Sequence, residues 1–148
     1  MTMEVDPIEA LVALAKAHAP LNTITGGRID NRHHYGQRNG DWSQTDKALT
    51  FQAIGGPSLL DDYWQQIQVQ ARCYGDTPYQ AGQVYKKLVD FTRQERRTVT
   101  VTEGKALINY VVPLAEARFI LDEDARPEGG MPAYLVNLEA QISELTVA

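Results

Sequence analysis

The side chains best suited to chemistry gather in one polar stretch in the first third of the chain. They are the imidazole and carboxylate groups of Asp30, His33, His34, Asp41 and Asp46. Imidazole nitrogens and carboxylate oxygens suit zinc and similar ions. The two histidines are adjacent, however, so they share no face of a regular element, and the spacing matches no metal motif. We therefore predict no metal ion and no other cofactor.

Other catalytic signatures are missing from the sequence. It contains no phosphate loop, no glycine fingerprint of a dinucleotide fold and no serine elbow. Cys73 falls on the apolar side of a strand pattern, where a thiol behaves as a small, inert hydrophobe. The carboxylate runs 61–62 and 122–124 fall in turn-like segments, where solvation explains them. We expect no catalytic residue and a protein that is not an enzyme.

The same polar stretch, residues 26–47, is longer than most connections in compact domains. Three arginines make it locally basic, and a tyrosine and a tryptophan are of the kind that concentrate binding energy at interfaces. The candidate interface residues are Arg28, Arg32, His33, His34, Tyr35, Arg38 and Trp42. A solvated loop with Trp42 against the core is the alternative interpretation, and the sequence leaves both open.

A strand, a tight turn and a helix are predicted around residues 66–90, because the hydrophobic period changes there from two to 3.6 residues. The apolar strand positions are Ile67, Val69, Ala71 and Cys73, alternating with Gln66, Gln68, Gln70 and Arg72. The apolar helix positions are Ala81, Val84, Tyr85 and Leu88. The glutamine side of the strand is either a solvated sheet face or a face that a neighbouring subunit covers.

The turn itself consists of Gly75, Asp76, Thr77 and Pro78. Glycine permits a sharp turn, and a positive φ angle is one reason it would be needed. Threonine is a good N-cap, proline fits the first helical position, and Gln80 stands where a capping box requires it.

The remaining patterns complete a single domain over residues 1–148. A first helix runs from Asp6 to His18, with Glu9 closing a capping box and Pro20 stopping it. Strands are expected at 47–56, where Gly55, Gly56 and Pro57 end the first one, then at 98–102, 106–112 and 134–142, with a hairpin turn at 103–105 and a loop at 122–132. This gives an α+β fold with one twisted, mostly antiparallel β-sheet and two α-helices packed on one face.

Composition limits the function classes. The 148 residues carry a net charge of −5, which argues against a duplex-DNA-binding surface without excluding a local basic patch. The single cysteine allows no intrachain disulfide, which fits a reducing cytoplasm. We find no apolar run of membrane-spanning length and no basic, signal-like N-terminus, so we expect no membrane contact.

Three stretches resemble one protein family over most of the chain. In chain order, "DPIEALVALAKAHAPL" with "GGRI", "KALTFQAIGGPSLL" and "RCYGDTPYQAGQVYKKL" are similar to segments of tail terminator (tail completion, or minor tail) proteins of long-tailed bacteriophages, in the same order. The resemblance implies a structural virion protein. Such proteins form a ring, typically a homohexamer, at the head-proximal end of the tail tube, stop its polymerisation and take part in head–tail joining.

The resemblance also implies partners and a location. The partners would be further copies of the chain, the tail tube protein and a head-side connector or stopper protein, with DNA only passing through the lumen. The location would be the tail or neck of the virion, and the host cytoplasm during assembly. Three alternatives stay open: another neck protein such as a head-completion or stopper protein, a small metal-dependent hydrolase built on His33 and His34, and a nucleic-acid-binding module using Arg28, Arg32, Arg38 and the run 93–97.

Overall fold

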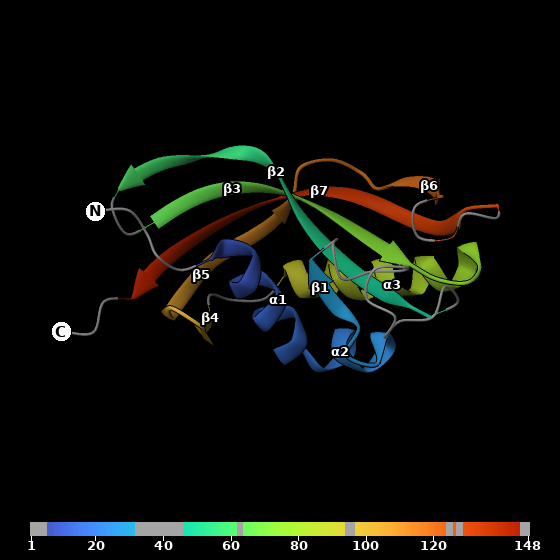
Figure 1. Cartoon of the computed structure of the whole chain (residues 1–148), viewed down its shortest axis with the longest axis horizontal. Helices are drawn as coiled ribbons and strands as arrows, with labels where there is room; N and C mark the ends of the chain where they lie inside the picture. The colour runs from blue at the N-terminus through green and yellow to red at the C-terminus, as the bar shows by residue number, and fades with distance from the viewer. Residues whose placement is uncertain are drawn as a thin grey trace.

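The computed structural model describes residues 6–31, 46–61, 64–93, 97–123, 126 and 129–145. Within them the chain forms three helices and seven strands. In order they are α1 (Pro7–Ala17), α2 (Ala19–Thr25), β1 (Ile29–Asn31), β2 (Ala48–Asp61), β3 (Trp64–Tyr74), α3 (Pro78–Thr92), β4 (Arg97–Val101), β5 (Gly104–Pro113), β6 (Arg118–Asp122) and β7 (Met131–Leu145). The fold is α+β. The sheet curls into a half-barrel over the helices (Figure 1).

The strand order in the sheet is β1-β2-β3-β7-β5-β4, and β6 pairs with β7 as well. Only the contact of β1 with β2 is parallel, and every other described pairing is antiparallel. The predicted mostly antiparallel sheet is therefore confirmed. The final strand, β7, lies in its middle, with β3 along one side and both β5 and β6 along the other.

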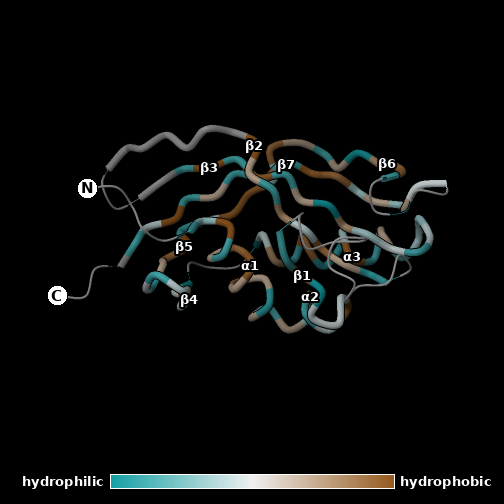
Figure 2. Tube along the Cα trace, in the orientation of Figure 1, coloured by the Kyte–Doolittle hydropathy of each residue, from teal (hydrophilic) through white to brown (hydrophobic). Residues whose placement is uncertain are grey.

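The main core lies between the sheet and the helices. Hydropathy alternates along the strands (Figure 2), so that one side of each strand is apolar. The buried strand positions that face the helices include Leu49, Phe51, Val69, Ala71, Cys73, Val136, Leu138 and Ala140. The helices contribute Leu11, Leu14, Leu21, Val84, Leu88 and Phe91. The strand positions predicted for Val69, Ala71 and Cys73 and the helical positions predicted for Val84 and Leu88 are confirmed.

Three helices replace the two that were predicted. The first helix ends at Ala17 because His18 adopts an extended backbone with ψ of 105°. Pro20 was expected only to stop that helix, but it also stands in the first turn of α2, where its missing N–H group costs no hydrogen bond. A second helix therefore starts at once and ends at Gly26, whose φ of 62° is the left-handed conformation that glycine favours.

The second strand is longer than predicted. Gly55, Gly56 and Pro57 were expected to end it, yet β2 continues to Asp61. Its register against β3 shifts between Ala53 and Gly55 and again before Ser58, so the irregular residues are absorbed as bulges. In the described residues β1 pairs only with the start of β2, so Pro57 lies on an edge, where a missing N–H is tolerated.

The beginning of the predicted polar loop is a strand. Ile29 to Asn31 form β1, which pairs in parallel with β2 from Leu49 to Phe51. Ile29 is fully buried in the core. Its apolar side chain was overlooked because polar residues surround it in the sequence. Residues 32–45, the rest of that loop apart from its last two positions, lie outside the described residues.

Candidate functional site

The turn after β3 is held by close packing. A Cβ atom added to Gly75 would lie 2.4 Å from the backbone nitrogen of Ala81 and 2.7 Å from the carbonyl carbon of Gln80. Gly75 is not among the described glycines with positive φ. The prediction that a positive φ angle requires glycine at this position is therefore wrong. The reason is space: the first turn of α3 packs directly against the backbone of the turn.

The predicted N-cap of α3 is confirmed. The Thr77 hydroxyl accepts a hydrogen bond from the N–H of Gln80 at 3.3 Å, and Pro78 occupies the first turn. The Gln80 side chain reaches back, as a capping box requires, but it accepts from the N–H of Asp76 at 3.1 Å rather than from Thr77. The turn therefore satisfies two backbone donors from side chains three to four residues away.

Arg126 fastens this turn to the connection between β6 and β7. One guanidinium nitrogen, Nη1, donates to Asp76 Oδ1 at 2.8 Å. The Nε and Nη2 atoms donate to the carbonyl oxygen of Gly130 at 3.2 and 3.0 Å. Two segments 50 residues apart are thus joined by one side chain. Asp76 was predicted as a turn residue, but its partner Arg126 could not be predicted from the sequence pattern.

A buried ionic cluster lies next to that fastening. The Oδ2 atom of Asp122 accepts hydrogen bonds from Arg72 Nη1 at 2.6 Å and from the Tyr74 hydroxyl at 2.5 Å. The side chain of Asp122 is only 4% exposed, and that of Arg72 is 16% exposed. Solvation was the predicted role of Asp122, and this is wrong: the carboxylate is a buried partner that joins β6 to β3. Asp122 is the last residue of β6, and this position at the end of a strand is the feature that could have indicated its burial.

Of the seven candidate interface residues, only Arg28 is described. Its Nε atom donates to the carbonyl oxygen of Lys47 at 2.8 Å and lies 3.8 Å from a carboxylate oxygen of Asp46. Arg28 therefore closes the base of the predicted loop. The other six, Arg32, His33, His34, Tyr35, Arg38 and Trp42, lie outside the described residues.

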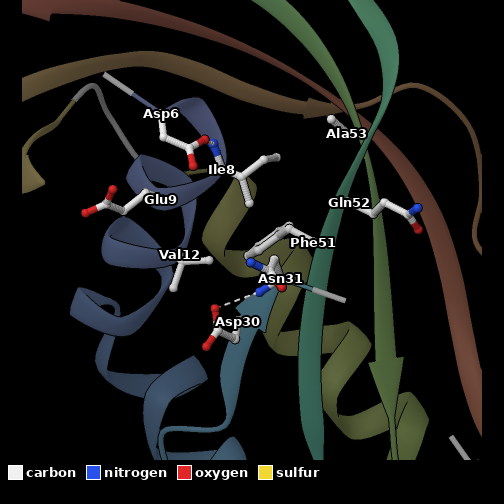
Figure 3. A pocket seen from close by; sticks show the side chains of 9 residues that line it. All are labelled: Asp6, Ile8, Glu9, Val12, Asp30, Asn31, Phe51, Gln52 and Ala53. Carbon is white, nitrogen blue, oxygen red and sulfur yellow. Dashed lines mark hydrogen bonds between the residues drawn. The ribbon is translucent and has the colours of Figure 1, made fainter. Parts of the chain in front are cut away.

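A pocket of about 530 Å³ opens between α1, β1 and β2 (Figure 3). Its lining comprises Asp6, Ile8, Glu9, Val12, Asp30, Asn31, Phe51, Gln52 and Ala53. The Asp6 carboxylate caps α1 by accepting from the N–H of Ile8 at 2.9 Å. Glu9 was predicted to close a capping box there, but one of its oxygens accepts instead from Thr102. Asp30 accepts from the N–H of Asn31 at 2.8 Å.

The pocket carboxylates Asp6, Glu9 and Asp30 accept hydrogen bonds from groups of the protein and so have structural roles. The prediction that no metal ion is bound rests on the sequence alone. In the described part of the chain no three His, Cys, Asp or Glu residues gather closely enough to hold an ion. Asp30 lies on β1 and Asp46 beside Arg28, while Asp41 and both loop histidines fall in the span 32–45. Cys73 is fully buried as predicted, and burial raises the pKa of its thiol far above the usual range.

The convex side of the sheet carries a polar surface that no described helix covers. We call it the amide face. Its members are connected by same-side cross-strand pairs, and they are Gln52, Gln66, Gln68, Gln70, Tyr110, Val112, Asn137, Glu139 and Gln141. Six of the nine are amides, and Glu139 alone carries a formal charge. The glutamine stripe was predicted, but its extension by β5 and β7 required the strand register.

One hydrogen-bonded chain crosses the amide face. The side-chain nitrogen of Gln66 lies 2.8 Å from the Tyr110 hydroxyl oxygen, and that hydroxyl donates to Glu139 at 3.1 Å. Partial burial, followed by the neighbouring Glu139, raises the pKa of Tyr110. The phenol therefore stays protonated and keeps donating. The chain links β3, β5 and β7 across their polar side.

Aromatic rings form a second exposed surface at the opposite side of β7. Tyr85 on α3 stacks on Tyr134 of β7 at 5.7 Å between centroids, and Phe119 of β6 meets Tyr134 edge-on at 5.5 Å. Phe119 is 42% exposed, and Leu121, two residues further along β6, is 56% exposed. The aromatic contacts thus end at an apolar strand on the margin of the sheet.

Neither models of known protein families nor curated proteins give a match to this chain. In the residues that the structure describes, no helix has both the length and the apolar character needed to span a bilayer.

Proposed function

We propose that this protein is a structural virion component, a tail terminator of a long-tailed bacteriophage. It forms a ring at the head-proximal end of the tail tube, stops polymerisation of the tube and joins the tail to the head connector. The proposal rests on the resemblance carried by the segments around residues 7–20, 47–60 and 72–88, together with the amide face as the structural observation that supports an assembly role.

The amide face has the composition of the core of a protein interface. Interface cores are depleted in charged residues relative to the rest of a protein surface. The nine residues of the amide face include a single carboxylate, which accepts from Tyr110, and Arg72, the next residue on the same side of β3, is paired with Asp122, so neither charge is left without a partner. Amide side chains both donate and accept, so they can match the hydrogen-bonding groups of a neighbouring subunit.

A ring of identical subunits needs two different surfaces on each copy, because only a heterologous contact whose rotation closes gives a cyclic assembly. In the proposed ring the amide face supplies one of the two surfaces. The protein makes and breaks no covalent bond, and its partners are further copies, the tail tube protein and the head-side connector. Its place is the virion tail or neck, and the host cytoplasm during assembly.

The charge of the chain fits a passage for DNA. Six copies, each with a net charge of −5, carry roughly −30 in total. Basic side chains are the groups that hold phosphates, so a lumen poor in them lets DNA slide through without binding. DNA is therefore a passing molecule in this proposal and not a ligand.

Tail assembly in the presence and absence of the purified protein tests the proposal. Tails made without it should vary in length and fail to join heads, and added protein should cap them, as seen by electron microscopy. Normal tails in its absence would overturn the proposal. The double variant Trp42→Ala with Arg32→Ala should lose length control if the loop predicted from the sequence is an assembly surface.

A matched pair of variants tests the amide face separately. Gln68→Arg places a large charged side chain at the exposed centre of that face, and it should weaken ring formation, because an interface must desolvate the guanidinium even where Glu139, directly opposite in the register, compensates part of its charge. Gln83→Arg makes the same change on α3, in the helical layer, and should leave the ring intact. Equal ring formation by both variants would remove the amide face from the interface.

A further inference from the structure

Strand β6 has an open edge. It pairs with β7 along one side, from Arg118 opposite Leu135 to Asp122 opposite Met131, and no other described strand pairs with it. It runs along the margin of the sheet in Figure 1. An open strand edge offers a row of backbone donors and acceptors that another extended chain can pair with.

Two of the three exposed side chains of β6 are apolar, and the third, Arg118, carries a charge at one end of the strand. Phe119 and Leu121 lie on one side of the strand, both largely exposed, while Ile120 on the other side packs against the small core around Tyr74 and Met131. An open strand edge with exposed apolar side chains is a favoured pairing site for a second chain. Its occupant must be an extended strand with apolar residues at alternate positions.

The sequence of β6 itself meets that description. In an antiparallel pair centred on Ile120, Phe119 of each copy lies opposite Leu121 of the second copy. Arg118 then lies opposite Asp122 of the second copy, so opposite charges meet at both ends of the pair. Parallel pairing in register would instead set Arg118 against the same arginine of the second copy, and like charges directly opposite each other are destabilising.

We infer that β6 is the site at which a second copy of this chain adds its own β6, antiparallel and centred on Ile120. The sheet then continues across a twofold axis from β7 through β6 into the β6 of the second copy. Asp122 is already held by Arg72 and Tyr74 within its own copy, so Arg118 of the second copy would join an existing ionic cluster. This contact is separate from the amide face and goes beyond the proposed ring.

Five residues per strand make a small contact. Interfaces under roughly 1,200 Å² are usually transient, so we expect the pair to form reversibly with rising concentration. Where the copies already stand in rings, the same contact joins two rings face to face. In either case removal of the contact should halve the mass of the largest assembly.

Analytical ultracentrifugation of the full chain over a wide concentration range tests this, with Leu121→Lys and Tyr79→Lys compared with the wild-type chain. Leu121→Lys should halve the mass, because the lysine lies against Phe119 of the second copy. Tyr79→Lys alters an exposed side chain on the first turn of α3 and should change nothing. The inference is overturned if the mass of the wild-type assembly never doubles with rising concentration. It is also overturned if the mass of the Leu121→Lys assembly doubles as that of the wild-type chain does.

Cysteine crosslinking tests the register. An equal mixture of Phe119→Cys and Leu121→Cys chains should crosslink to each other several-fold faster than either variant crosslinks to itself. Directly opposite residues have Cβ atoms about 5 Å apart, and diagonal neighbours are further apart. Cys73 is fully buried and stays silent. Equal rates for all combinations would contradict the proposed register, and the outcome is independent of the tail assay.

Discussion

The carboxylate of Glu9 accepts two hydrogen bonds from Thr102, one from its backbone N–H at 2.7 Å and one from its hydroxyl at 2.8 Å. The two residues are 93 positions apart. Glu9 lies in the first turn of α1, and Thr102 lies in the turn between β4 and β5. The Glu9 side chain therefore fixes the tip of the β4–β5 hairpin, which lies at the end of the sheet.

Replacement of Glu9 by alanine should destabilise the fold by about 1–2 kcal/mol, because it removes the oxygen that accepts both hydrogen bonds from Thr102. Glu9→Gln keeps a carbonyl acceptor in the same place and should cost less. Urea unfolding gives the free energies, and amide exchange at Thr102 reports the local effect. If exchange at Thr102 is as slow in Glu9→Ala as in the wild-type chain, the bond does not hold the hairpin.

Two glycine substitutions with the same added methyl group should have opposite effects. Gly75→Ala places its Cβ against the backbone of Ala81 and Gln80, and we expect a cost of about 2–3 kcal/mol from overpacking. Gly82→Ala lies within α3, where the new Cβ meets only the Tyr134 ring at 3.7 Å. It should be neutral or stabilising by up to about 1 kcal/mol, because alanine is the better helix former. Equal unfolding midpoints would show that the turn can yield.

Two aspartate-to-asparagine substitutions separate the buried pair from the surface pair. Asp122→Asn leaves the largely buried Arg72 guanidinium without a countercharge and should cost about 3 kcal/mol. Asp76→Asn removes the negative charge opposite Arg126 at a side chain that is 42% exposed, so it should cost less than about 1 kcal/mol. A smaller loss for Asp122→Asn than for Asp76→Asn would contradict the ranking by burial.

His18 should make the fold sensitive to acid. Burial is the largest cause and lowers the pKa of its imidazole below the usual 6.5. The negative charge of Asp90 raises this pKa, and the positive charges of Arg97 and Lys87 lower it. The unfolded chain then binds the proton first, so stability is complete above pH 6.5 and falls as the pH drops through the folded pKa. His18→Gln should lose less stability on acidification, as measured by urea unfolding at several pH values. Identical pH dependence of both chains would exclude His18 as the cause.

The local features could be predicted from sequence wherever one short segment determines them. The alternation from Ile67 to Cys73, the cap at Thr77 and the stripe of α3 depend on neighbours within a few residues, and all three are confirmed. Pro20 was misjudged because a proline that ends one helix can also begin the next, and only the backbone of His18 distinguishes these outcomes.

Features that depend on distant partners could not be predicted. The burial of Asp122 follows from Arg72, 50 residues away, and the amide face needed the register of β5 and β7. A sequence pattern gives the side of a strand that is polar, but it does not give the neighbours in the sheet. Most of the candidate interface residues lie in 32–45, so their role stays a prediction.

The central position of β7 has a consequence for how the chain folds during synthesis. Among the described strands, the three partners of β7 all precede it in the sequence, and within the sheet β3 and β5 are joined through β7. Until residues 131–145 leave the ribosome, the hairpins β2–β3 and β4–β5 are separate pieces with open edges. Closing the sheet must then bring together segments with large sequence separation, which is slow. A nascent chain of this protein is therefore exposed to edge-to-edge aggregation from the synthesis of β3 until β7 has emerged, and the sheet is completed only after translation has passed β7.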